Sequence, residues 1–169
     1  MRTRISMLLA AAALAAALSP LSAQAETVIR YGISMADIPQ TTGQPDRGAG
    51  AYQFSAYTIY DPLVAWEMDV ADRPGKLVPG LATEWKVDDS DKKKWIFKLR
   101  KGTTFHNGKS VTSDDVVATI NYHINKDSKS PAKAVLSSVA SVSGDGPETV
   151  IFELSGGNAD FPYLLSDYH

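Results

Sequence analysis

The chain has 169 residues, of which 44% are hydrophobic and 21% are charged, as in an ordinary globular protein of about one domain. Its 17 basic residues stand against 19 acidic ones, and no basic stripe is present, so we expect no nucleic-acid partner. The absence of cysteine excludes disulfides, thiol nucleophiles, Cys-ligated zinc and a lipid anchor on an N-terminal cysteine.

The first 25 residues have the pattern of an export signal. Arg2 and Arg4 precede an unbroken apolar run over residues 7–18, and Ala23-Gln24-Ala25 forms an A-x-A cleavage site. A transmembrane anchor is the alternative, but this run is shorter than the ~18 residues that span a bilayer. The pattern predicts a cleavable signal peptide over residues 1–25 and a periplasmic protein.

Three elements are expected in the next part of the chain. Residues 27–33 alternate between polar and apolar side chains, which predicts a half-buried strand. Residues 34–50 are rich in Gly, Pro, Thr, Gln and Asp and predict a long loop, a kind of segment that often carries function. Apolar residues at helical spacing over residues 52–63 predict a helix that ends at the Asp61-Pro62 pair.

Two hairpins are expected after Pro79. Residues 84–88 and 95–100 alternate around the polar turn Asp88-Asp89-Ser90-Asp91, which predicts two antiparallel strands. Asn107-Gly108 supplies two residues that tolerate positive φ, which predicts a type I′ turn between residues 105–106 and 109–111.

A capped helix and a third strand pair follow. Thr112 and Asp115 have the spacing of a capping box, and the helix that they begin has an apolar stripe. The stripe consists of Val116, Val117, Ile120 and Ile124. Residues 135–143 and 148–154 predict two strands joined by the turn Gly144–Pro147. The apolar run over residues 161–165 has no evident partner, which suggests that the chain is interrupted.

Reactive residue types occur without the spacing that catalysis or metal binding needs. His106, His123 and His169 share no metal-ligand spacing, and Asp114-Asp115 is explained by the start of a helix. The run GDGPET joins two predicted strands and lacks the third glycine of a phosphate-binding loop. The residues favour a binding or structural protein, and we expect no catalytic residue, no metal and no cofactor.

Residues 77–120 closely resemble the region that is typical of extracytoplasmic solute-binding proteins of family 5, the dipeptide/oligopeptide class that serves ABC importers. The matches occur in order along several short elements, so the signal is stronger than one motif. The matching residues are Pro79, Gly80, Leu81, Ala82 and Trp85, then Trp95, Phe97, Leu99, Arg100, Gly102, Phe105, His106 and Gly108, and finally Thr112, Asp115 and Val116. Before this region, Tyr60, Pro62 and Leu63 resemble a further short element of the family. We expect structural roles for these positions in strands, turns and a helix cap.

The resemblance implies an α/β protein with the class II periplasmic binding fold and a β-rich additional domain. The chain would hold only the N-terminal part of that fold, and this part is α+β-like by itself. We expect a signal peptide at residues 1–25, the start of the first ligand-binding lobe at 26–60 and the additional domain at 61–169. Family members are several hundred residues longer, so the resemblance implies a truncated member without the second lobe.

The function implied by the resemblance is the capture of peptides for transport by an ABC permease of the inner membrane. We expect a monomer whose ligand-facing loop follows the first strand, with Ser34, Met35 and Ala36 as ligand contacts. Three alternatives stay open. The same fold could bind a saccharide, a metal chelate or another small solute, the chain could be a non-transport interaction domain, or it could be a periplasmic enzyme that depends on His106 or Asp115.

Overall fold

The computed structural model describes residues 28, 30, 32, 60–130 and 132–166. The chain divides into two units, Met1–Gly32 and Ile33–His169, and the described strands and helices all belong to the second unit. The predicted signal peptide, the loop at residues 34–50 and most of the helix at residues 52–63 lie outside the described residues. Of the strand predicted at residues 27–33, only Val28, Arg30 and Gly32 are described, and none of these three is in a strand.

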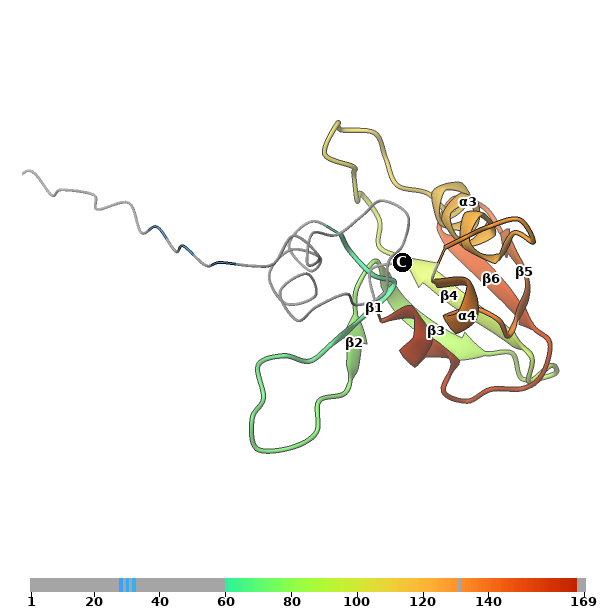
Figure 1. Ribbon diagram of the computed structural model, residues 1–169, viewed down its shortest axis with the longest axis horizontal. Coiled ribbons are helices and arrows are strands. Elements are labelled where there is room, and N and C mark those ends of the chain that lie inside the picture. Colours follow the sequence, from blue (N-terminus) through green and yellow to red (C-terminus); the bar gives the residue numbers. More distant parts are fainter. Residues whose placement is uncertain (1–27, 29, 31, 33–59, 131, 167–169) are drawn as a thin grey trace, which may run out of the picture. The chain divides into compact units, whose positions relative to one another are not determined.

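A four-stranded antiparallel sheet forms the centre of the second unit (Figure 1). Its strand order is β3-β4-β6-β5, with bounds Ala82–Val87, Lys94–Leu99, Thr149–Leu154 and Val139–Gly144. The pairs β3·β4 and β5·β6 confirm the first and third predicted strand pairs. On β4 the alternation places Trp95, Phe97 and Leu99 on one buried face, because successive side chains of a strand point to opposite sides.

A second, two-stranded sheet was not predicted. It pairs β1 (Val64–Trp66) with β2 (Leu77–Pro79), and Ala65 lies opposite Val78. Each strand has 3 residues, which is too short for alternation to give a sequence signal. The connecting loop is closed by the bond from Glu67 N–H to the Lys76 carbonyl at 2.9 Å and by the Arg73–Glu67 ion pair at 2.7 Å.

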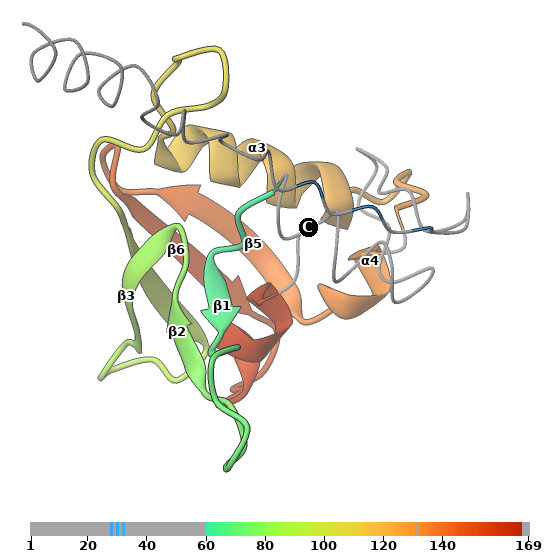
Figure 2. The same ribbon diagram turned by 90° about the vertical axis from the view of Figure 1, so that its left-hand side faces the viewer.

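Helix α3 (Ser113–Ile124) covers one face of the sheet (Figure 2). The predicted capping box is formed, and the apolar stripe faces the core: Val116 and Ile120 are buried, and Val117 and Ile124 pack against them. The sequence therefore located the start and the buried side of this helix correctly.

The predicted strand at residues 135–143 begins too early. Residues 132–135 form the short helix α4 (Ala132–Val135), and β5 starts at Val139. The Ser130 hydroxyl accepts the Ala132 N–H at 3.2 Å, and the Leu136 N–H donates to the Ala132 carbonyl at 2.9 Å. A local serine cap thus starts a helical turn where the apolar pattern had suggested a strand.

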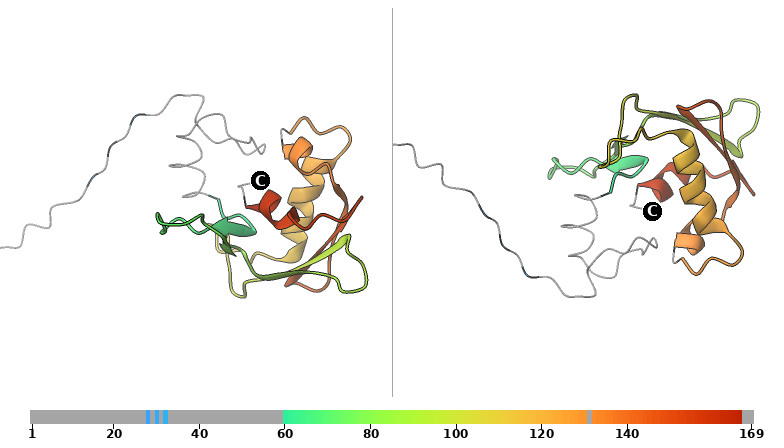
Figure 3. Two further views of the ribbon diagram at one scale, coloured as in Figure 1. Left: turned by 90° about the horizontal axis from the view of Figure 1, so that it is seen from below. Right: turned by 90° about the horizontal axis from the view of Figure 1, so that it is seen from above.

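The apolar run near residue 165 has a partner, so the expectation that it is unpartnered is wrong. It forms the 3₁₀ helix η3 (Phe161–Leu165), on the same side of the sheet as α3 (Figure 3). Phe161 is fully buried. The centre of its ring lies 5.2 Å from the ring centre of Phe152 and 6.3 Å from the ring centres of Phe97 and Trp95. This aromatic cluster, Trp95, Phe97, Phe152 and Phe161, fills the centre of the core.

The hairpin at residues 104–110 is present, but its turn is not type I′. Among the described residues only glycines have positive φ, and in this turn it is Gly108, at 83°. The Gly108 N–H donates to the Phe105 carbonyl at 2.8 Å, and the Phe105 N–H donates to the Lys109 carbonyl at 2.8 Å. These bonds fit a three-residue loop with a glycine bulge, in which Asn107 keeps an ordinary negative φ.

Candidate functional site

The residues singled out from the sequence do not meet at one place in the part of the chain that the structure describes. Ser34, Met35, Ala36 and His169 lie outside the described residues. His106 is exposed on the turn of the hairpin. His123 is a buried residue of α3, and its Nδ1 lies 2.8 Å from the hydroxyl of Ser130, the residue that caps α4. The position of His123 thus supports a packing role.

Three of the short sequence elements that carry the family resemblance meet in space. The Leu81 and Ala82 N–H groups donate to the Pro62 and Leu63 carbonyls at 2.9 and 2.8 Å. Arg100 adds two bonds, from its N–H to the Leu81 carbonyl at 2.8 Å and from Nη2 to the Gly80 carbonyl at 2.9 Å. We call residues 62–63, 80–82 and 99–100 the signature junction. It joins the two-stranded sheet to the four-stranded sheet through three main-chain hydrogen bonds and one from the Arg100 side chain.

Gly80 is required in the signature junction for a steric reason. A Cβ at this position would collide with the Pro62 carbonyl oxygen and would lie 2.9 Å from the Leu63 carbonyl oxygen. Both contacts are with main chain, which cannot rotate away as a flexible side chain can. The glycine therefore allows the close approach of the segments that precede β1 and follow β2.

The start of α3 is a second cluster of functional-type residues, and it is occupied by structural bonds. The Asp115 Oδ2 accepts the Thr112 N–H at 2.9 Å and the Thr112 hydroxyl at 3.0 Å, and Oδ1 lies 3.1 Å from the Lys109 Nζ. The bond from the Thr112 N–H, and then those from Lys109 and the hydroxyl, hold the pKa of Asp115 below its usual value. A carboxylate held ionised in this way caps a helix and is a poor general base.

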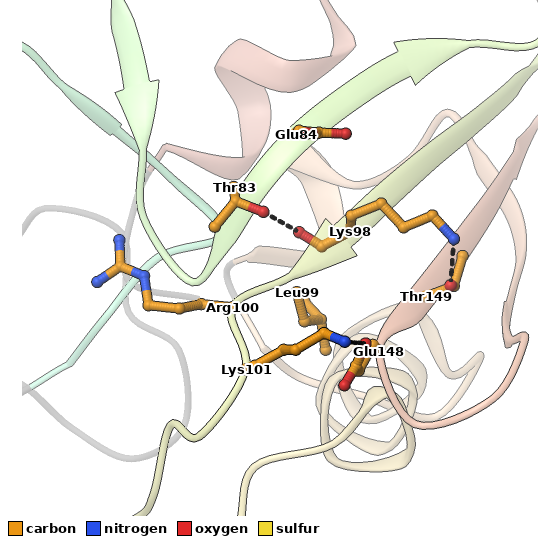
Figure 4. Close-up of a pocket in the computed structure, with 8 residues that line it drawn as sticks. All are labelled: Thr83, Glu84, Lys98, Leu99, Arg100, Lys101, Glu148 and Thr149. Carbon is orange, nitrogen blue, oxygen red and sulfur yellow. Dashed lines mark hydrogen bonds and ion pairs between the residues drawn. The ribbon is translucent and has the colours of Figure 1, made fainter.

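A hollow lies on the solvent-facing side of the four-stranded sheet, beside the signature junction (Figure 4). Its volume is about 470 Å³. The residues that line it are Thr83, Glu84, Lys98, Leu99, Arg100, Lys101, Glu148 and Thr149. The alternation on β3 and β4 was visible in the sequence, but nothing in the sequence indicated that outward side chains, together with Leu99 of the buried face, border a hollow.

The charged groups of the hollow do not converge on a common point. Lys98 Nζ donates to the Thr149 hydroxyl at 2.7 Å, and Lys101 Nζ pairs with Glu148 at 3.3 Å. Arg100 points away from this pair and bonds to the Gly80 carbonyl (Figure 4). The Lys101 and Glu148 side chains are 82% and 44% exposed, so water competes for both. This arrangement offers no aligned nucleophile, base and anion-binding group.

A metal centre and a membrane span are both absent from the described residues. These residues hold no group of three or more His, Asp or Glu side chains placed to bind a metal ion. Within the same ranges, no helix has the length and apolar character needed to cross a membrane.

Comparison with known proteins gives the family. The model of the bacterial extracellular solute-binding proteins, family 5 Middle, matches residues 76–169. The matched region includes the four-stranded sheet, α3 and most of the signature junction. It covers more than half of the chain.

Individual relatives agree with this match. The chain is 37% identical over 109 residues to the uncharacterized protein YhjP of Bacillus subtilis, covering 64% of this chain and 18% of that protein. It is 40% identical over 72 residues to a probable peptide ABC transporter periplasmic-binding protein of Sinorhizobium fredii, covering 43% and 12%.

A solved structure supports the same relationship. The binding protein AgaA of Agrobacterium tumefaciens R10, in complex with agropinic acid, is 29% identical with a TM-score of 0.58. The alignment covers 66% of this chain and 21% of AgaA. The chain therefore spans about a fifth or less of the length of these three proteins, and its fold is part of the mixed α and β architecture of the periplasmic binding proteins. The chain belongs to family 5 of the bacterial extracellular solute-binding proteins.

Proposed function

We propose that the protein serves an ABC importer as its solute-capturing component in the periplasm, and that its solutes are short peptides. The observation that carries the proposal is the family match over residues 76–169. The peptide assignment is supported by the relative in Sinorhizobium fredii, whose name gives peptide transport as its function. No step of catalysis is part of this proposal, because the family is one of solute-binding proteins and the described side chains form no catalytic arrangement.

The same proposal assigns different roles to different segments of the chain. Residues 26–60 would contribute to the ligand-binding lobe, with Ser34, Met35 and Ala36 as contacts, and the domain at residues 61–169 would be a structural addition to it. A structural role for the second segment is supported by the Lys101–Glu148 ion pair and the Lys98–Thr149 hydrogen bond in the hollow, and by the buried signature positions. The signal peptide at residues 1–25 would direct export.

A second candidate is the capture of a different small solute. AgaA, which shares this fold, was solved with agropinic acid, so the fold accommodates ligands other than peptides. The two candidates differ in the ligand alone, and one experiment compares them.

Uptake in cells tests the proposal with the protein as it exists. The gene is deleted, and uptake of labelled dipeptides, tripeptides and agropinic acid is compared before and after complementation with the wild-type gene. We expect peptide uptake to fall and to return on complementation. Unchanged peptide uptake contradicts the peptide assignment, and a selective loss of agropinic acid uptake supports the second candidate.

The expected contacts are tested in the same assay. Complementation with Ser34→Trp should restore less peptide uptake, because a bulky side chain would block a ligand-facing position. Ser90→Trp, at an exposed turn between β3 and β4, is the matched control and should restore uptake fully. Equal restoration by both variants contradicts the placement of the ligand at Ser34.

A further inference from the structure

One asparagine of the chain differs from the others in the residue that follows it. The chain has four asparagines, Asn107, Asn121, Asn125 and Asn158, and their following residues are Gly, Tyr, Lys and Ala. Asn107 is exposed on the hairpin at residues 104–110, where water has access to its side chain. Since glycine has no Cβ, the main-chain nitrogen of Gly108 is sterically open to the side-chain amide of Asn107.

Two hydrogen bonds of the turn involve the groups that would react if the Gly108 nitrogen attacked the Asn107 side-chain amide. The Lys109 N–H donates to the Asn107 Oδ1 at 3.0 Å, so a donor already faces the oxygen on which negative charge develops when Cγ is attacked. The attacking group is held back, because the Gly108 N–H donates to the Phe105 carbonyl at 2.8 Å. The Asn107 side-chain carbonyl is thus polarised by one hydrogen bond, while the Gly108 N–H is engaged in another.

We propose that Asn107 is a site of spontaneous deamidation whose rate in the folded protein is set by the opening of the Gly108–Phe105 hydrogen bond. The Gly108 nitrogen loses its proton to solvent base and attacks the Asn107 Cγ. The bond from Cγ to the side-chain nitrogen breaks, this nitrogen takes up a proton from solvent and leaves as ammonia, and a succinimide forms. Water then opens one of the two ring carbonyls and gives aspartate or isoaspartate. Water is the only co-reactant.

The product would loosen the hairpin. Isoaspartate adds a methylene to the main chain inside the turn, which displaces the Phe105–Lys109 hydrogen bond and the Thr104·Ser110 bridge next to it. Lys109 also pairs with Asp115 at the start of α3 and lies 5.9 Å from the Phe105 ring centre. The modification would therefore weaken the Lys109–Asp115 contact between the hairpin and the start of α3.

Two other asparagines are matched controls within the chain. The Oδ1 atoms of Asn125 and Asn158 also accept the N–H of the second residue along, Asp127 and Asp160, each at 2.9 Å. Their side-chain geometry is therefore the same type of Asx turn as at Asn107. They differ in the next residue, Lys126 or Ala159, whose Cβ crowds the attacking nitrogen.

The test is peptide mapping by mass spectrometry with separation of isoaspartate. The folded full chain is incubated at mildly alkaline pH beside a blocked synthetic peptide of residues 103–111. We expect Asn107 to convert before the other three asparagines. We also expect it to convert roughly threefold to tenfold more slowly in the chain than in the peptide, the range that one net hydrogen bond supports. Asn107→Gln should abolish the early product.

Each outcome bears on a separate part of the proposal. Earlier conversion at another asparagine overturns the assignment of the site. Conversion of Asn107 in the folded chain at the rate of the peptide, or faster, overturns the claim that the Gly108–Phe105 hydrogen bond slows the reaction. Lys126→Gly supplies a second Asn-Gly pair in an Asx turn, and conversion of Asn125 should then accelerate. No acceleration would overturn the role given to the glycine.

Discussion

The two faces of the four-stranded sheet differ in what they contribute to the molecule. One face holds Trp95, Phe97 and Leu99 at 8%, 0% and 7% exposure, and the opposite face of β4 holds Lys98 and the half-buried Ile96. The buried face packs against α3 and η3, whereas the outer face carries a hollow in which Lys101 pairs with Glu148. The residues of β4 that carry the family resemblance are those of the buried face. On this strand, the resemblance therefore reflects the packing of the core.

The largest effect is expected where the buried face is densest. Phe97→Ala removes a fully buried ring that lies 5.4 Å from Phe152, and it should lower the free energy of unfolding by about 3–5 kcal/mol. Urea denaturation followed by tryptophan fluorescence measures the loss. Ile96→Ala, the neighbour on the outer face, is the control and should cost less than about 1 kcal/mol. Equal losses would remove the distinction between the faces.

A smaller loss is expected at the signature junction. Gly80→Ala places a methyl group against the Pro62 and Leu63 carbonyl oxygens, and overpacking of this kind costs about 1–3 kcal/mol. Gly156→Ala is the control, since a Cβ at Gly156 would have no heavy atom within 4 Å. Thermal unfolding of both variants measures the difference. An unchanged melting temperature for Gly80→Ala would show that these two segments can move apart without a cost in stability.

The helix cap gives a prediction that depends on pH. Asp115→Asn should lower the free energy of unfolding by about 1 kcal/mol at neutral pH, because the ionised carboxylate holds Thr112 and Lys109. The pKa of Asp115 in the folded chain lies below its ordinary value of 3.8, so its contribution is complete above that value and is lost as the pH falls through the lowered pKa. The difference between wild type and variant should therefore shrink in acid. A constant difference at all pH values would contradict this.

The smallest effect is expected in the hollow. Lys101→Ala breaks an ion pair between two exposed side chains and should change the free energy of unfolding by less than about 0.5 kcal/mol. Chemical denaturation in low salt is the most sensitive measurement, since salt screens such pairs. A loss as large as that of Gly80→Ala would place the hollow among the structural elements of the domain.

The sequence predicted those parts of the fold that depend on local chemistry. The alternation of β4, the Thr112–Asp115 cap and the stripe of α3 were all predicted correctly, because each is set by neighbouring residues. The β1·β2 sheet and the burial of Phe161 depend on partners distant in sequence, so no local pattern revealed them. The turn at Asn107 was assigned to the wrong type, since the same residues fit a loop with a glycine bulge. Ligand contacts at Ser34, Met35 and Ala36 remain predictions.

Hydrogen exchange of main-chain amides tests the central claim, that the residues shared with the family hold the fold together. The amides of Leu81, Ala82 and Arg100 donate to carbonyls of the signature junction and should exchange as slowly as those of β4 and β6. The exposed loop residues 71–73 should exchange fast and serve as the reference. Exchange of the junction amides at the rate of this loop would contradict the claim.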